Sequence, residues 1–298
     1  MSALPPLPFP VQAPERTWTV DTPVRLNVVE WGPADGPPLC LAHGGGDFAR
    51  TFDGLAPLLA AAGWRVCAWD QRGHGDSEQV ELYGYDADVR DGAVVVEAVG
   101  RGRPVALFGH SKGGRLVIEL TIARPDLVSA HVALDGFNRR RAWAEPTAAV
   151  AATWCDARRA GRSFRRGTAA ELAERRAAQN PRLAGSWLAY LVSVGARPGE
   201  DRSWGWKLDP ASFPPPPHPW SYERSLGTLE QVSRPLLALK AGVEEAMASQ
   251  PPADALRAHL PPHTRLDVLD GLGHFAHIEA PERVAALVVA FLEPWRAA

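Results

Sequence analysis

Short apolar runs alternate with helix-length segments along most of this 298-residue chain, and this rhythm narrows the choice of fold more than any other property. Runs that are apolar throughout indicate strands buried on both faces, as in parallel sheets covered by helices. The helix-length segments between them supply the crossovers that parallel strands need. The sequence therefore predicts an α/β fold, with a mostly parallel sheet between layers of helices.

Eight runs fit strands of one sheet, and the first two fit a hairpin. The expected strands are Arg16–Val20, Val24–Trp31, Pro38–Ala42, Arg65–Trp69, Val105–Phe108, Ala130–Leu134, Leu236–Lys240 and Arg265–Leu269. The expected helices are Phe52–Ala62, Ala87–Gly100, Lys112–Ala123 and a terminal helix that begins at Pro281.

The rhythm stops at Gly136. Residues 137–224 hold amphipathic helical pieces and a Pro-rich stretch, but no clear strand. We therefore predict a core of residues 1–136 and 225–298, interrupted after the sixth strand by one largely helical insertion.

Composition and charge argue against several other classes of protein. The net charge of −2 gives no reason to expect binding to nucleic acid or to a membrane surface. No apolar run approaches the length of a membrane span, and the N-terminus lacks the pattern of a secretory signal. The three cysteines stand at unrelated spacings and suggest neither a disulfide framework nor a metal site. We expect a cytoplasmic protein without metal or cofactor.

The segment Gly109-His110-Ser111-Lys112-Gly113-Gly114 joins an expected strand to an expected helix. In that context the pattern G-x-S-x-G is typical of a nucleophilic serine on a sharp turn. Small flanking residues are needed because the strained serine brings neighbouring backbone close together. The hydroxyl group of Ser111 would then stand at the helix N-terminus, where the N–H of Lys112 can face a developing oxyanion.

Three more motifs follow expected strands: His43-Gly44-Gly45-Gly46-Asp47, Asp70-Gln71-Arg72-Gly73-His74-Gly75-Asp76-Ser77 and Gly273-His274-Phe275. With the serine turn, they resemble the α/β-hydrolase fold family over nearly the whole chain. The resemblance implies an eight-stranded, mostly parallel sheet, with Ser111 as nucleophile and His274 as base. It also implies an oxyanion hole formed by the N–H of Gly45 or Gly46 beside that of Lys112. The segment that begins at Asp70 is interpreted as a structural turn.

The acid that would orient His274 is open between two carboxylates. Glu245 follows the penultimate strand, where the family usually has an aspartate, and it is the preferred candidate. Asp135 ends the strand before the insertion, a position from which some family members take their acid. A simpler role exists for each, as a solvated loop charge for Glu245 and a turn cap for Asp135.

By the same resemblance, the insertion is expected to form a cap over the active site. Six of the eleven tryptophans fall in it, and Trp143, Trp187 and Trp206 are expected substrate contacts. Aromatic density favours an apolar substrate, although a small cap also needs large residues for its own core. The insertion holds 15 Lys and Arg against 8 Asp and Glu, a net charge of +7, which leaves −9 for the rest. This charge could attract an anionic substrate or an acidic carrier protein, but arginines of this kind are more often a solvated helix face.

The leading hypothesis is a serine hydrolase that cleaves a carboxylic ester or lactone of a small, mainly apolar molecule. Thioester and carbon–carbon bond hydrolysis are close alternatives, as is a non-hydrolytic lyase or cyclase on the same fold. A binding protein without turnover is disfavoured by the intact Ser111 and His274. Epoxide hydrolysis and dehalogenation are disfavoured because those members attack with aspartate. The expected partner is the small-molecule substrate, and homodimerisation is left open.

Overall fold

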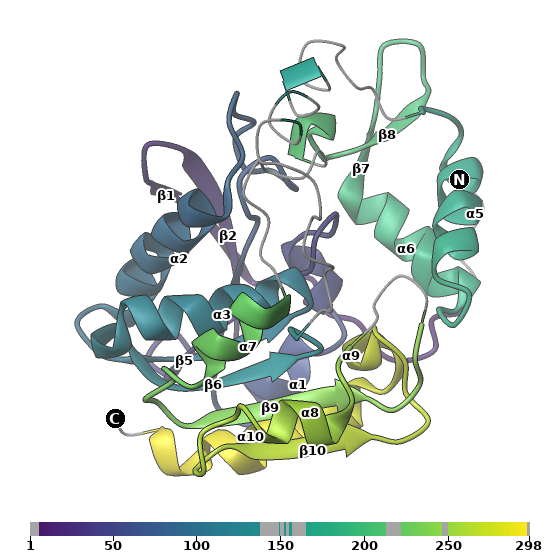
Figure 1. Cartoon of the computed structure of the whole chain (residues 1–298). Helices are drawn as coiled ribbons and strands as arrows, with labels where there is room; N and C mark the ends of the chain where they lie inside the picture. The colour runs from purple at the N-terminus through teal and green to yellow at the C-terminus, as the bar shows by residue number, and fades with distance from the viewer. Residues whose placement is uncertain are drawn as a thin grey trace.

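The computed structural model describes residues 6–137, 149, 152, 155–156, 165–212, 222–245 and 250–296. Its main feature is an eight-stranded sheet with the strand order β1-β2-β4-β3-β5-β6-β9-β10 (Figure 1). The strands are β1 (Arg16–Asp21), β2 (Arg25–Trp31), β3 (Pro38–Ala42), β4 (Arg65–Trp69), β5 (Val105–His110), β6 (Val128–Leu134), β9 (Leu236–Ala241) and β10 (Arg265–Leu269). Among the described pairings of this eight-stranded sheet, those of β2 with β1 and β4 are antiparallel and the others are parallel, which confirms the predicted mostly parallel sheet.

The strands of the sheet centre are buried along their whole length. Every residue of β3, β4, β5, β6 and β9 is buried. At the edge of the sheet, only Leu266 and Leu269 of β10 are buried, and the other three residues are more exposed. This difference explains why the central strands read as continuous apolar runs, since both of their faces meet helices.

Helices cover both faces of the sheet. On one face, α1 (Ala56–Ala61) and α10 (Pro281–Leu292) pack against a cluster that includes Leu39 and Leu41. On the other, α2 (Tyr85–Gly100) and α3 (Lys112–Ala123) pack against a cluster that includes Cys40. Neighbouring residues of β3 thus point to opposite layers, as expected for a strand. The two short helices α8 (Ala253–Arg257) and α9 (Ala276–Glu279) flank β10 along the chain.

Between β6 and β9 the chain leaves the sheet and forms the inserted segment. Its described elements are α5 (Ala169–Gln179), α6 (Gly185–Gly195), β7 (Ala196–Pro198), β8 (Trp204–Trp206) and α7 (Tyr222–Leu229). Helix α5 begins with a capping box, in which Thr168 and Glu171 satisfy each other's backbone N–H groups. In Figure 1, α5 and α6 stand beside the sheet rather than in its helical layers.

Two details of the inserted segment differ from the sequence prediction. The expectation of no strand was wrong, because β7 and β8 form an antiparallel pair. Each strand has only three residues, too few for an alternation to be recognised in the sequence. The core was predicted to resume at residue 225, a position that falls inside α7. Leu226 and Leu229 of this helix pack with Ile118 of α3.

Within the described residues, no helix is both long and apolar enough to cross a membrane.

Candidate active site

Ser111 occupies the sharp turn between β5 and α3. Its backbone has φ 55° and ψ −118°, a conformation that a residue with a side chain adopts only under strain. A Cβ atom on Gly109 would collide with the carbonyl group of Gly113, and one on Gly113 would collide with that of Ala42. The glycines of the motif therefore permit the close backbone packing that holds the serine in place.

His274 and Asp135 form a buried pair beside this turn. His274 Nδ1 lies 2.9 Å from Asp135 Oδ2, and the two side chains are 6% and 1% exposed. Asp135 directly follows β6, the neighbour of β5 in the sheet, whereas His274 lies on the loop between β10 and α9. With the carboxylate accepting from Nδ1–H, the lone pair of the ring lies on Nε2, the state required of a general base.

Glu245 binds the same histidine through the main chain. Its Oε2 accepts a hydrogen bond of 2.5 Å from the backbone N–H of His274. The geometry therefore reverses the order of preference drawn from the sequence, because Asp135 and not Glu245 contacts the imidazole ring. The second oxygen of Asp135, Oδ1, accepts the backbone N–H of Ala241 at 2.7 Å, which fixes the orientation of the carboxylate.

Two more histidines, His110 and His277, lie next to the loop of His274. His110 Nε2 lies 2.8 Å from the carbonyl oxygen of His274, so that ring nitrogen carries the proton and donates. The ring of His277 lies 4.3 Å from that of His110, centroid to centroid. Burial lowers the pKa of His110 well below its ordinary value and that of His277 to about 3. Both rings are therefore neutral at physiological pH and pack as aromatic groups.

The loop after β3 places the expected oxyanion donors next to the serine turn. A Cβ atom on Gly44 would lie 3.3 Å from the Ser111 Cβ, so the two segments are in contact. The N–H of Gly46 donates to His74 Nε2 at 3.3 Å, and it is thus already engaged. Among the hydrogen bonds of the described residues, none uses the N–H of Gly45 as donor. Gly45 is therefore the better candidate beside Lys112, which begins α3 with an N–H that has no intrahelical acceptor.

Asp70 anchors the turn that the sequence marked as structural. Its buried carboxylate accepts hydrogen bonds from the Asn27 side chain and from the backbone N–H groups of Ala49 and Asp76.

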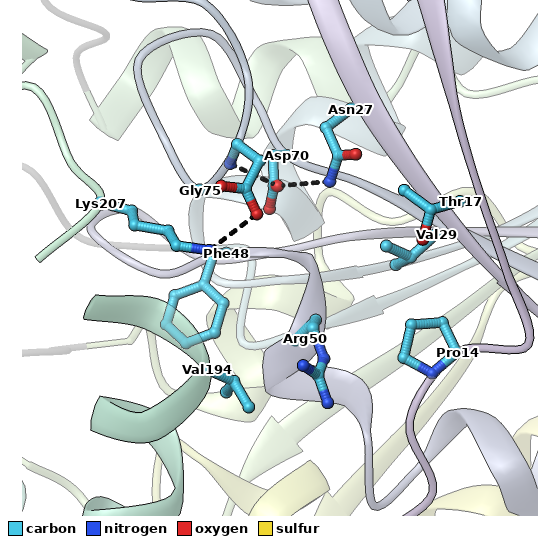
Figure 2. A pocket seen from close by; sticks show the side chains of 11 residues that line it. Pro14, Thr17, Asn27, Val29, Phe48, Arg50, Asp70, Gly75, Val194 and Lys207 are labelled. Atoms are coloured by element: carbon cyan, nitrogen blue, oxygen red, sulfur yellow. Dashed lines mark hydrogen bonds and ion pairs between the residues drawn. The ribbon is translucent and has the colours of Figure 1, made fainter. Parts of the chain in front are cut away.

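Asp70 also borders a cavity of about 190 Å³, to which Val194 and Lys207 of the inserted segment contribute. Figure 2 shows the Lys207 side chain at one side of this cavity. Its ammonium group pairs with Asp76 at 2.8 Å. Ser111 and His274 do not line it.

The expected tryptophan contacts have different surroundings. Trp187 is fully buried in a cluster with Phe9 and Phe275, so it packs the inserted segment onto the core. Trp206 is partly buried against the same cluster. Trp143 lies outside the described residues. The packing role of Trp187 could not be separated from substrate contact in the sequence, since both uses require a large apolar side chain.

Comparison with known proteins finds one family model and several relatives that match parts of the chain or nearly all of it. The family model described as serine aminopeptidase S33 matches residues 37–181. Epoxide hydrolase A of Mycobacterium tuberculosis is 38% identical over 129 residues, which are 42% of this chain and 40% of that protein. The magnesium-chelatase 30 kDa subunit of Rhodobacter capsulatus is 27% identical over 284 residues, 91% of this chain and 92% of that protein. The match spans less than half the length of the first four curated relatives.

A solved thioesterase domain from the curacin biosynthetic pathway has the same fold. It superimposes with a TM-score of 0.80 at 19% identity, and the match covers 92% of this chain and 99% of that one. The strand order and this superposition show that the chain has the α/β-hydrolase fold.

Proposed function

We propose that this protein is a serine hydrolase that cleaves a carboxylic ester or lactone through an acyl-enzyme, with Ser111, His274 and Asp135 as its catalytic triad. The observation that carries the proposal is the strained Ser111 turn beside the buried pair of His274 and Asp135. The names of several relatives, among them an epoxide hydrolase and a lipase, support hydrolysis in general.

In the proposed reaction, Ser111 Oγ attacks the carbonyl carbon of the substrate while His274 Nε2 takes the hydroxyl proton. The carbonyl oxygen becomes an oxyanion, which accepts from the N–H groups of Gly45 and Lys112. His274 then gives its proton to the departing alcohol, and the bond between carbon and alkoxy oxygen breaks. Water repeats the sequence on the acyl-enzyme, so the acid is released and Ser111 regains its proton. Asp135 stabilises the imidazolium ion in both halves.

The ester specificity rests on Ser111 as the nucleophile and on the backbone N–H groups of Gly45 and Lys112 as oxyanion donors. Epoxide hydrolysis is not proposed, despite the relatives of that name, because this position holds Ser111 rather than aspartate. A thioester substrate would follow the same steps, with a thiol as the leaving group.

A second candidate is a biosynthetic role without hydrolysis. The relative that spans nearly the whole chain is named as a subunit of magnesium chelatase. We rank this role second because a protein without acyl transfer has no use for the strain at Ser111.

Labelling with a fluorophosphonate probe tests the proposal without knowledge of the natural substrate. We expect a single adduct on Ser111 in the peptide mass spectrum, and turnover of p-nitrophenyl esters of short acyl chains. Ser111→Ala should abolish both. An unlabelled parent protein with a normal circular dichroism spectrum would favour the second candidate.

A further inference from the structure

Arg182 of the inserted segment binds the loop that holds His274. The residue lies between α5 and α6, and its guanidinium group donates to Glu279 from Nε at 2.9 Å and from Nη2 at 2.6 Å. Nη2 also donates to the carbonyl oxygen of Gly271 at 2.7 Å. A forked donor thus joins the inserted segment to the loop at Gly271 and to the end of α9 at Glu279.

Glu279 links Arg182 to the main chain of the residue before His274. Its Oε1 accepts the backbone N–H of Gly273 at 3.0 Å, while its other oxygen faces Arg182. The following N–H, that of His274, is held by Glu245. Consecutive amide groups of the loop are therefore fixed by two carboxylates, of which one is oriented by the inserted segment.

Gly273 is the point at which these groups meet. A Cβ atom there would lie 2.5 Å from Glu245 Oε2, 2.6 Å from Arg182 Nε and 2.7 Å from Glu279 Oε1. Two carboxylates this close repel each other unless a cation lies between them. The guanidinium of Arg182 supplies that charge, and the hydrogen bond to Glu279 raises the pKa of Arg182 above its ordinary value.

Apolar packing holds the inserted segment against the same loop. Leu183, Trp187 and Leu188 form one buried cluster with Phe275 and Ile278. This contact holds the segment against the loop but does not fix their relative orientation, because apolar packing is tolerant of small rotations. The hydrogen bonds of Arg182 and Glu279 fix the orientation, because hydrogen bonds depend on angle.

We propose that Arg182 and Glu279 are positioning residues for His274, which couple the seating of the inserted segment to the orientation of the catalytic base. The base would then be in its working position only while the segment is docked on its loop. This inference rests on the proposed hydrolase function.

The test compares Arg182→Gln with Arg175→Gln, which removes a guanidinium group of the same segment that binds the Arg165 carbonyl instead. In Arg182→Gln we expect kcat on a small p-nitrophenyl ester and the rate of fluorophosphonate labelling to fall about 10- to 100-fold, since a small misplacement of a catalytic group has effects of this size. The KM value and the melting profile should change little. The Arg175→Gln control should behave as the parent.

Exchanging the charges at residues 182 and 279 distinguishes a role in positioning His274 from a role that only holds the inserted segment in place. The double variant Arg182→Glu with Glu279→Arg restores an ion pair, but an arginine at 279 cannot accept the N–H of Gly273. We expect the double variant to keep the melting profile of the parent protein and to show the lowered kcat of Arg182→Gln.

Recovery of kcat by the exchange would overturn the proposal, as would parent kcat in Arg182→Gln. Should the Gln variant fail to fold, Arg182→Lys decides, because its single ammonium group cannot form the fork. A lowered kcat at unchanged KM supports positioning, and parent kcat contradicts it. A parent protein that is not labelled at Ser111 would instead refute the hydrolase function itself.

Discussion

Replacing Asp135 by asparagine should stop catalysis while leaving the fold in place. In the parent protein, Oδ1 accepts the N–H of Ala241 and Oδ2 faces His274 Nδ1. An asparagine must keep its carbonyl oxygen on Ala241, because that N–H is buried and needs an acceptor. Its amide group is then forced to donate to Nδ1, which moves the ring proton to Nε2. A histidine in that state cannot accept the proton of Ser111.

The expected size of the effect follows from this tautomer change. In serine hydrolases of another fold, the equivalent substitution lowers kcat by about 10⁴-fold. That factor corresponds to about 5.4 kcal/mol of transition-state stabilisation, at about 1.36 kcal/mol per tenfold change. Loss of fold is not expected, because residue 135 has φ 50° and asparagine tolerates this region well.

The assay is steady-state hydrolysis of p-nitrophenyl acetate, with active sites counted by fluorophosphonate titration. Glu245→Gln is the matched control, since a glutamine oxygen can still accept the backbone N–H of His274. We expect the control to retain at least about a tenth of the parent kcat, because only a neutral acceptor replaces a charged one. A Glu245→Gln variant that loses far more than Asp135→Asn would refute the assignment and restore Glu245 as the acid.

Substitutions at three other positions test separate parts of the structure. Ser111→Gly and Ser111→Ala should both be inactive, but the glycine variant should be more stable by about 1 kcal/mol in urea titrations, because glycine relieves the strain at φ 55°; equal stabilities would contradict the strain. Gly273→Ala should lower kcat about 10- to 100-fold, since the added methyl group displaces Glu245, Arg182 and Glu279; an unchanged kcat in the ester assay would show that the loop adapts. Burial lowers the pKa of His131 from 6.5 to about 3, so the native protein binds fewer protons than the unfolded chain between these values and loses stability as the pH falls through them. His131→Leu should therefore make the decline of the free energy of unfolding below pH 6.5, measured by urea titration, less steep by up to about 1.4 kcal/mol per pH unit. An unchanged slope would count against the shift.

The sequence was sufficient to predict the sheet because its central strands are buried on both faces. Pro38–Ala42 and Arg65–Trp69 have the same bounds in the structure as in the prediction, and so does the helix Lys112–Ala123. Each apolar run is short and ends at a Gly- or Asp-containing turn, which limits the possible boundaries. The pair β7 and β8 could not be predicted, since strands of three residues have no readable period.

The acid of the proposed triad is the part of the site that the sequence did not predict. Glu245 and Asp135 both follow strands of the sheet, and spacing alone cannot say which carboxylate reaches a ring nitrogen. The choice depends on the loop after β9, where Gly242 and Val243 bond to Leu269 and Leu272. These bonds direct Glu245 to the main chain of His274 rather than to its ring. The positive φ of Asp135 gave no signal, because aspartate is common in turns.

Because β5 and β6 are neighbours in the sheet, activity and fold should be lost at different points during denaturation. Ser111 and Asp135 each follow one of these hydrogen-bonded central strands, so their separation changes only when the sheet itself opens. His274 lies on a loop that is held at Gly271, Gly273 and His274 by hydrogen bonds with side chains. Such contacts open at a lower free energy than a buried strand pair. As urea or temperature rises, the histidine would leave its two partners first. Loss of activity would then precede loss of the circular dichroism signal. Early inactivation would be reversible, because the loop of His274 can bind again to a sheet that is still folded.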